Sequence, residues 1–279
     1  MLIGSASLAM GPLMVRLADV GPTASGFWRM ALAAPVLLLV CRFGGQTTGR
    51  IDRRILVPIL LAGLLFASDL AAWHAGIVRT TLANSVLFGN TTSFAFAAYG
   101  FIVARRLPGR NALLALLLAA AGVILLMGRS YELSPDHFIG DLLCLLAALF
   151  YTLYLIAIGH ARGVLKPLPT LALVTSVGAA FMLIFVGLSG ETIWPTDWTP
   201  LVVLALSSQI LGQGLIIFAL PHLAPMTAGL CLLIQPVIAA AIGWTMFDER
   251  LGALDFVGAG MILVALILVR APDKSAPAG

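Results

Sequence analysis

Ten apolar runs, each about as long as a bilayer is thick, occupy most of this chain of 279 residues. A helix needs roughly 20 residues to cross the hydrocarbon core, which is about 30 Å thick. Short polar or Pro/Gly-containing turns separate the runs, and none of them is long enough to form a soluble domain. The approximate boundaries are 2–18, 23–41, 55–77, 82–104, 111–128, 139–159, 168–188, 200–220, 226–247 and 252–269.

Composition agrees with a chain that spans a membrane. Hydrophobic residues make up 61% of the sequence and charged residues 10%, whereas about a quarter of a soluble domain is charged. Backbone groups in lipid must be paired internally, and these runs are continuous rather than alternating. We therefore predict an all-α integral membrane protein whose surroundings are the lipid bilayer.

The cysteines give no sign of a disulfide framework or a metal site. Cys41, Cys144 and Cys231 each lie inside an apolar run, and no two of them have the short spacing of a zinc motif. We expect them to behave as small hydrophobic residues. The sequence predicts neither a metal nor a cofactor.

Lys and Arg are unequally divided between the two sets of loops, which predicts the orientation. Eleven lie in the loops after the second, fourth and sixth runs or in the C-terminal tail, and three lie on the opposite side. By the positive-inside rule, both termini are cytoplasmic, and we expect a multi-pass protein of the cell inner membrane. The net charge of +4 then follows from topology, and no nucleic-acid partner is expected.

Residues 65–107 and 210–251 share one plan of two apolar helices joined by a turn. A shift of 144 residues superposes Arg106-Leu107 on Arg250-Leu251. The same shift aligns polar residues deep in the helices: Asp69 with Gln213, and Thr91 with Gln235.

A repeat after five spans has a geometric consequence. An odd number of crossings inserts the second half upside down relative to the first. We therefore predict ten transmembrane helices in two inverted five-helix repeats, 1–129 and 138–270, around a central cavity, followed by a cytoplasmic tail, 271–279. A ten-span bundle can hold a complete pathway, so we expect a monomer.

Several short motifs occur in a recognisable order: Phe27-Trp28-Arg29, Gly140-Asp141-Leu142-Leu143, Ala147-Ala148-Leu149-Phe150-Tyr151, Gln235-Pro236-Val237 and Asp248-Glu249-Arg250-Leu251. In their order and spacing they resemble the EamA type of the drug/metabolite transporter superfamily. The resemblance implies a ten-span exporter or carrier of metabolites, similar to the amino-acid exporters of the YddG kind. One departure is Thr91-Thr92, where many members have a proline.

Two ionisable side chains lie deep in the first half. An ionisable group in hydrocarbon costs about 2.5 to 3.5 kcal/mol on insertion scales, so it faces the bundle interior. Arg29 and Asp69 both lie roughly 10 to 12 Å below the outer surface. They form either a clamp for the carboxylate and ammonium of an amino acid or a structural ion pair. Trp73 follows one turn after Asp69, and His74 either titrates with Asp69 or stays neutral.

Further polar and aromatic residues are candidates to line the cavity. Asn84, Phe88 and Thr91 form a stripe on one helix face. Alternatively, such side chains join neighbouring helices by hydrogen bonds, and the tyrosines belong to an interfacial belt. The other candidates for substrate contact are Asn90, Tyr151, Tyr154, Gln209, Gln213 and Gln235.

Two prolines are candidate hinges. Pro12 and Pro236 would each free the carbonyl four residues earlier, that of Leu8 or Leu232, for a substrate or water. The alternative is a packing kink without a ligand. At the end of the first run, Arg16 is expected to extend to the interface beside Asp19.

The sequence thus favours a secondary transporter that exports small metabolites by alternating access. Hydrophobic or aromatic amino acids are the first expectation for the substrate, and nucleobases, cationic compounds or other drugs are the alternative. An intramembrane enzyme is a remote alternative, because the sequence contains no H-E-x-x-H or G-x-S-x-G motif. We therefore predict that the chain is not an enzyme.

Overall fold

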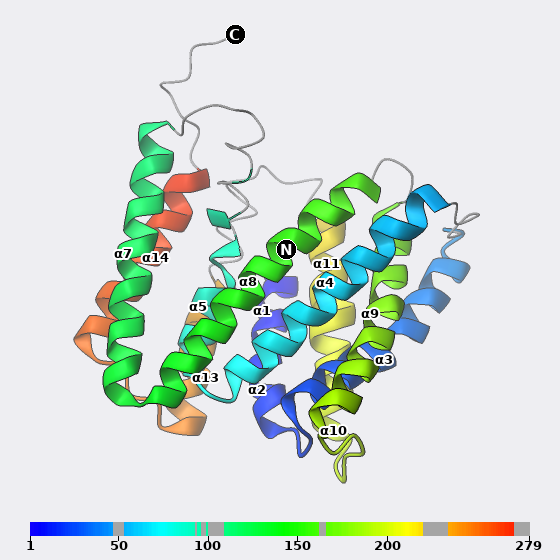
Figure 1. Cartoon of the computed structure of the whole chain (residues 1–279), viewed down its shortest axis with the longest axis horizontal. Helices are drawn as coiled ribbons and strands as arrows, with labels where there is room; N and C mark the ends of the chain where they lie inside the picture. The colour runs from blue at the N-terminus through cyan, green and yellow to red at the C-terminus, as the bar shows by residue number, and fades with distance from the viewer. Residues whose placement is uncertain are drawn as a thin grey trace.

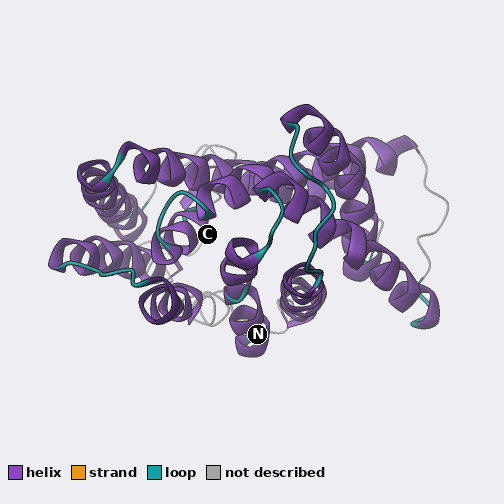
Figure 2. Cartoon of the chain, turned by 90° about the horizontal axis from the view of Figure 1, so that it is seen from below, coloured by secondary structure: helices purple, strands orange, loops and turns teal. Residues whose placement is uncertain are grey.

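The computed structural model describes residues 1–46, 53–92, 94–95, 99, 109–161, 166–219 and 234–270. All regular structure in these ranges is helical, as Figures 1 and 2 show. The elements are α1 (Leu2–Ala9), α2 (Gly11–Leu17), α3 (Pro22–Phe43), α4 (Arg53–Ile77), α5 (Leu82–Gly89), α7 (Arg110–Leu133), α8 (Pro135–Ala161), α9 (Pro167–Ser189), α10 (Thr199–Leu204), the π-helix η1 (Ala205–Gly212), α11 (Gln213–Ala219), α13 (Ile234–Phe247) and α14 (Ala253–Arg270).

The helices follow the predicted apolar runs, and the all-α membrane class is confirmed. Within the described ranges, five helical stretches are long and apolar enough to cross a membrane, and shorter apolar helices accompany them. The rest of the fourth run, beyond 95, and the start of the ninth, 226–233, lie largely outside the described residues.

Two of the runs are not continuous α-helices. The first is interrupted at Met10, and Pro12 is the second residue of α2, where a missing N–H group leaves no helical bond unmade. The eighth run passes from α10 through the π-helix η1 into α11. π-Helical turns are rare and often lie at functional sites. The two interrupted runs are neighbours, since α1 contacts η1.

Helices far apart in the sequence pack side by side. α4 runs against α8 and α9, α3 packs on α9, and α7 lies beside α14 (Figure 1). The shorter α5 contacts α13, and α1 contacts η1. Gly122 and Gly258 allow α7 and α14 to approach closely, because a Cβ on Gly122 would lie 2.8 Å from the Gly258 carbonyl oxygen.

Candidate functional site

A buried arginine from α3 joins three helices in the middle of the bundle. Arg29 is 2% exposed, and its Nε donates to Oε1 of Gln209, in η1, at 3.1 Å. The amide nitrogen of Gln209 donates in turn to Oγ1 of Thr175, in α9, also at 3.1 Å. Gln209 and Thr175 are fully buried. This chain of hydrogen bonds fixes the position of the guanidinium group.

Trp73 forms a wall beside this arginine. The guanidinium carbon of Arg29 lies 5.8 Å from the centre of the Trp73 ring, within the range of a cation–π contact. The indole nitrogen donates to the Ser85 carbonyl at 3.1 Å, which links α4 to α5. Trp73 is half-buried and packs against three of the apolar clusters of the bundle. It therefore lies where several helices converge.

Several polar atoms near this point are not satisfied by the described residues. Arg29 Nη1, His74 Nε2 and Ser208 Oγ are buried and have no hydrogen-bond partner within the described part of the chain. Leaving a buried polar group unpaired costs about 1 to 3 kcal/mol, and more for a charged group. Such groups in a native protein therefore suggest a site completed by a ligand or water.

Asp69, on α4, brings a negative charge to the same region. It is 8% exposed and interacts electrostatically with Arg29, but among the described residues no ion pair joins the two side chains. The direct structural ion pair considered from the sequence is therefore not formed. Opposite charges lie near one another without neutralising each other by contact. We call Arg29, Asp69, Trp73, His74, Ser208 and Gln209 the central cluster.

His74 has a structural partner on α3. Its Nδ1 lies 2.8 Å from Oγ of Ser25, and both side chains are fully buried. No hydrogen bond between described residues links His74 to Asp69. Joint titration of the two therefore stays a prediction without a contact to support it.

The predicted stripe on α5 is largely satisfied by its own surroundings. Asn84 is buried, and its side-chain amide nitrogen lies 3.5 Å from each carboxylate oxygen of Asp141, on α8. Phe88 is fully buried in an apolar cluster. Asn90 donates to the Val86 carbonyl, and Thr91 to the Phe88 carbonyl. α5 ends at Gly89, so Thr91 lies beyond the helix on which the stripe was predicted. Thr91 and its neighbour Asn90 are half-buried and keep partly accessible surface.

The two predicted tyrosines pack in an aromatic group between α4 and α8. Tyr154 is 5% exposed and stacks on Phe66, with ring centres 5.0 Å apart. The ring centre of Tyr151 lies 5.3 Å from that of Tyr154, and Tyr151 is half-buried. Both rings therefore pack against other aromatic side chains of the bundle.

Two further candidates lie in the second half of the chain. Gln213 is the first residue of α11 and is half-buried, and Gln235 is half-buried in the first turn of α13. Pro236 is buried in that same turn. Leu232, whose carbonyl we expected it to free, lies outside the described residues.

Sequence reasoning missed some of the residues that form hydrogen bonds in the interior of the bundle. Thr175, Ser25 and Ser208 are small hydroxyl residues within apolar runs, where nothing in the local pattern distinguishes them. We expected Arg16 to extend to the interface. Its guanidinium group binds Glu249 and the carbonyls of Ile77 and Thr80, while Asp19 accepts hydrogen bonds from Thr196 and Asp197. The partner of Arg16 was hidden because it lies in the other half of the chain.

Comparisons with known proteins agree with this architecture. Residues 138–271 match the EamA-like transporter family. One solved crystal structure covers 96% of this chain and 94% of its own, with a TM-score of 0.67 and 14% sequence identity. At that identity the likeness concerns the fold alone. No curated protein matches the sequence.

Proposed function

We propose that this chain, whose residues 138–271 match the EamA-like transporter family, exports hydrophobic or aromatic amino acids by alternating access. The family is one of membrane transporters of small molecules rather than of enzymes. The direction of transport comes from the resemblance described above. The substrate class comes from the chemistry of the central cluster.

The observation that carries the proposal is that Arg29 Nη1 is buried without a hydrogen-bond partner among the described residues, and that Arg29 forms no ion pair with the nearby Asp69. Such a guanidinium nitrogen matches a carboxylate, since charge-assisted hydrogen bonds of this kind are among the strongest in proteins. The Asp69 carboxylate, which forms no ion pair with Arg29, offers a counterion for an ammonium group. The half-buried indole of Trp73 adds an apolar surface. A zwitterion with an apolar side chain complements all three.

The packing of the helices supports two related halves. The first half contains α1 to α7 and the second α8 to α14, each with five predicted spans. If the two halves are related by symmetry, a contact between two spans should recur between their counterparts in the other half, five spans away. The contact of α4 (third span) with α8 (sixth) then corresponds to that of η1 (eighth) with α1 (first). In the same way, the contact of α4 with α9 corresponds to that of η1 with α3, and the contact of α5 with α8 corresponds to that of α13 with α1. All of these contacts occur, as expected for a pseudo-twofold axis.

The cationic substrates considered as an alternative fit the central cluster less well. A cation bound at Asp69 would lie near the positive charge of Arg29, and it would leave Arg29 Nη1 without a partner among the described residues. A neutral nucleobase would bring no charge to pair with either Arg29 or Asp69. An amino acid compensates both at once.

Counterflow in liposomes tests the proposal. Purified protein is reconstituted in vesicles loaded with unlabelled tryptophan, phenylalanine or leucine, and entry of the labelled amino acid is measured. We expect exchange of these amino acids but not of tryptamine, which lacks the carboxylate, or of indole-3-propionate, which lacks the amine. Equal exchange of tryptamine and tryptophan would contradict the assignment of the substrate class.

A further inference from the structure

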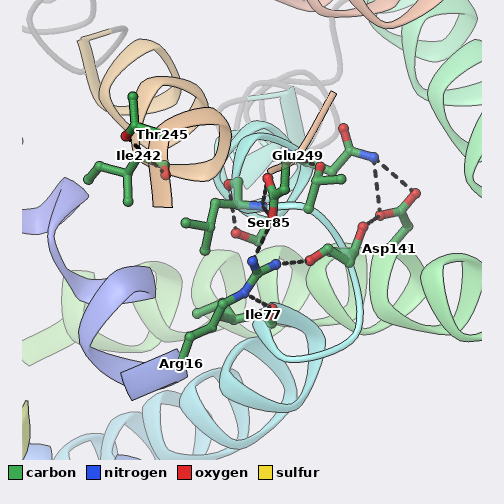
Figure 3. A network of polar contacts seen from close by, with 11 residues as sticks. Arg16, Ile77, Ser85, Asp141, Ile242, Thr245 and Glu249 are labelled. Atoms are coloured by element: carbon green, nitrogen blue, oxygen red, sulfur yellow. Dashed lines mark hydrogen bonds and ion pairs between the residues drawn. The ribbon is translucent and has the colours of Figure 1, made fainter. Parts of the chain in front are cut away.

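A second polar group lies where α2, the α4–α5 turn and the α13–α14 loop meet (Figure 3). Arg16, in the last turn of α2, binds Glu249 with Nη1 at 2.5 Å from Oε1. Its Nε donates to the Ile77 carbonyl at 3.0 Å, and its Nη2 donates to the Thr80 carbonyl. One guanidinium group therefore joins the end of α4 and the following turn to the second half of the chain.

Glu249 also holds the beginning of α5. Its two carboxylate oxygens accept from the Leu82 backbone N–H at 3.1 and 2.9 Å. Leu82 is the first residue of α5, where the free N–H groups and the helix dipole favour a negative charge. The side chains of Arg16 and Glu249 are only 14% and 11% exposed. The carboxylate is thus enclosed between a cation and a helix N-terminus.

Gly243, on α13, makes room for that carboxylate. A Cβ at this position would lie 2.2 Å from Oε2 of Glu249, closer than any non-bonded contact. The backbone N–H of Glu249 donates to the Gly243 carbonyl at 3.1 Å, so the loop folds back onto its own helix. Asp248 precedes this fold with a φ of 52°. The loop is therefore shaped to present Glu249 to α5.

A second carboxylate from the second half binds the same turn. Asp141, on α8, accepts from the Thr80 hydroxyl and lies 3.5 Å from the Asn84 amide nitrogen. Asp141 and Thr80 are both buried. The turn between α4 and α5 is thus held by Glu249 on one side and by Asp141 on the other.

We infer that Arg16, Glu249 and the N-terminus of α5 form a gate, here called the latch, which closes this end of the transport pathway. The inference rests on the alternating access proposed above, in which one end of the bundle must separate while the other stays shut. Glu249, in the second half, binds both Arg16 and the Leu82 backbone N–H, in the first half, so separating the halves here must break these contacts. By the distribution of Lys and Arg, this end faces outward.

Cysteine crosslinking tests the latch directly. In a background with Cys41, Cys144 and Cys231 changed to Ala, Arg16→Cys and Glu249→Cys are combined and the protein is reconstituted. Oxidation should abolish amino-acid exchange, and reduction should restore it. The two single-cysteine variants, treated in the same way, should show no reversible loss. Full exchange by the crosslinked protein would overturn the inference.

A second measurement does not depend on the substrate. Asn90→Cys, placed in that background, is labelled with a membrane-impermeant maleimide from the side of the latch. Gly243→Ala should increase the labelling rate, because the added methyl group displaces the Glu249 carboxylate. Gly187→Ala is the matched control, since a Cβ there meets no atom within 4 Å. Equal labelling in the two variants would contradict the latch.

The two measurements separate failure of the latch from failure of the proposed function. Labelling that rises in Gly243→Ala while no amino acid exchanges would support the latch and reject the substrate class. Exchange that proceeds normally while neither the crosslink nor Gly243→Ala has an effect would reject the latch alone.

Discussion

The latch and the central cluster each contain an inward-turned arginine, but they differ in how fully its nitrogens are bonded. Every side-chain nitrogen of Arg16 donates to an acceptor. Arg29 is more deeply buried, yet Nη1 lacks a partner among the described residues. A fully bonded arginine stabilises one arrangement of the helices. An incompletely bonded one leaves capacity for a ligand, and the difference separates a structural contact from a binding site.

The largest expected effect comes from removing the incompletely bonded charge. Arg29→Gln should lower the affinity for the amino acid by about 100-fold, because losing one partner of a buried charged hydrogen bond costs about 3 kcal/mol. Concentration-dependent counterflow measures this change. The melting temperature of the ligand-free protein should not fall, since the variant removes a buried charge that is not fully satisfied. A lower melting temperature with unchanged affinity would mean that Arg29 stabilises the fold and does not bind the substrate.

A smaller change is expected from the acidic side of the central cluster. Asp69→Asn keeps a carbonyl oxygen that can accept from the substrate ammonium but cannot exchange a proton near neutral pH. We expect passive exchange to persist and the component driven by a pH gradient to disappear. Uptake into vesicles with and without an imposed gradient measures both. If the variant responds to the gradient as the unchanged protein does, Asp69 does not couple transport to protons.

Removing a charge from the latch should lower the stability of the fold, whereas removing the Arg29 charge from the central cluster should not. Glu249→Gln keeps the size of the side chain but removes the charge that faces Arg16 and the α5 N-terminus. We expect a loss of about 2 kcal/mol in stability, since breaking a buried ion pair costs about 3 to 5 kcal/mol and this one is only partly buried. Thermal unfolding in detergent measures the loss, with Glu191→Gln as a matched control. Glu191 binds the beginning of α3 through Thr23 and Ala24, and it forms no ion pair with another described residue. An equal loss in both variants would mean that the Arg16 ion pair adds nothing.

The smallest effect concerns an exposed contact between loops. Hydrogen bonds from the Thr196 side chain and from the Thr196 and Asp197 backbone lower the pKa of Asp19 below its usual 3.8. The contact therefore stabilises the fold above the unfolded pKa and is lost as the pH falls through the folded one. Melting curves below about pH 4 should show a small acid-dependent loss that is absent in Asp19→Asn. Identical acid dependence in the two proteins would contradict this role.

The helices could be predicted from the sequence because each apolar run must satisfy its own backbone in lipid. The interruption of the first run was also visible, since Gly11-Pro12 stands in its middle. The inverted relation of the two halves stays a prediction that the helix contacts support. The ends of the helices depend mainly on the residues nearest to them, so they can be predicted from one sequence.

The polar contacts were harder to predict because they join distant parts of the chain. Arg29 and Gln209 were both candidates, but nothing in the sequence indicated that they bind each other across 180 positions. Arg16 and Glu249 are 233 positions apart, and no local pattern pairs them. The π-helix that carries Gln209 and Ser208 has no recognisable pattern in its eight residues. Tertiary packing decides these features.

Ligand-induced stabilisation of the purified protein tests the central claim most directly, because a ligand that binds only the folded state raises the melting temperature. The account predicts that tryptophan or phenylalanine raises the melting temperature of the unchanged protein, that tryptamine and indole-3-propionate have much smaller effects, and that Arg29→Gln abolishes the rise. Equal stabilisation of the unchanged protein and Arg29→Gln by the same amino acid would contradict it.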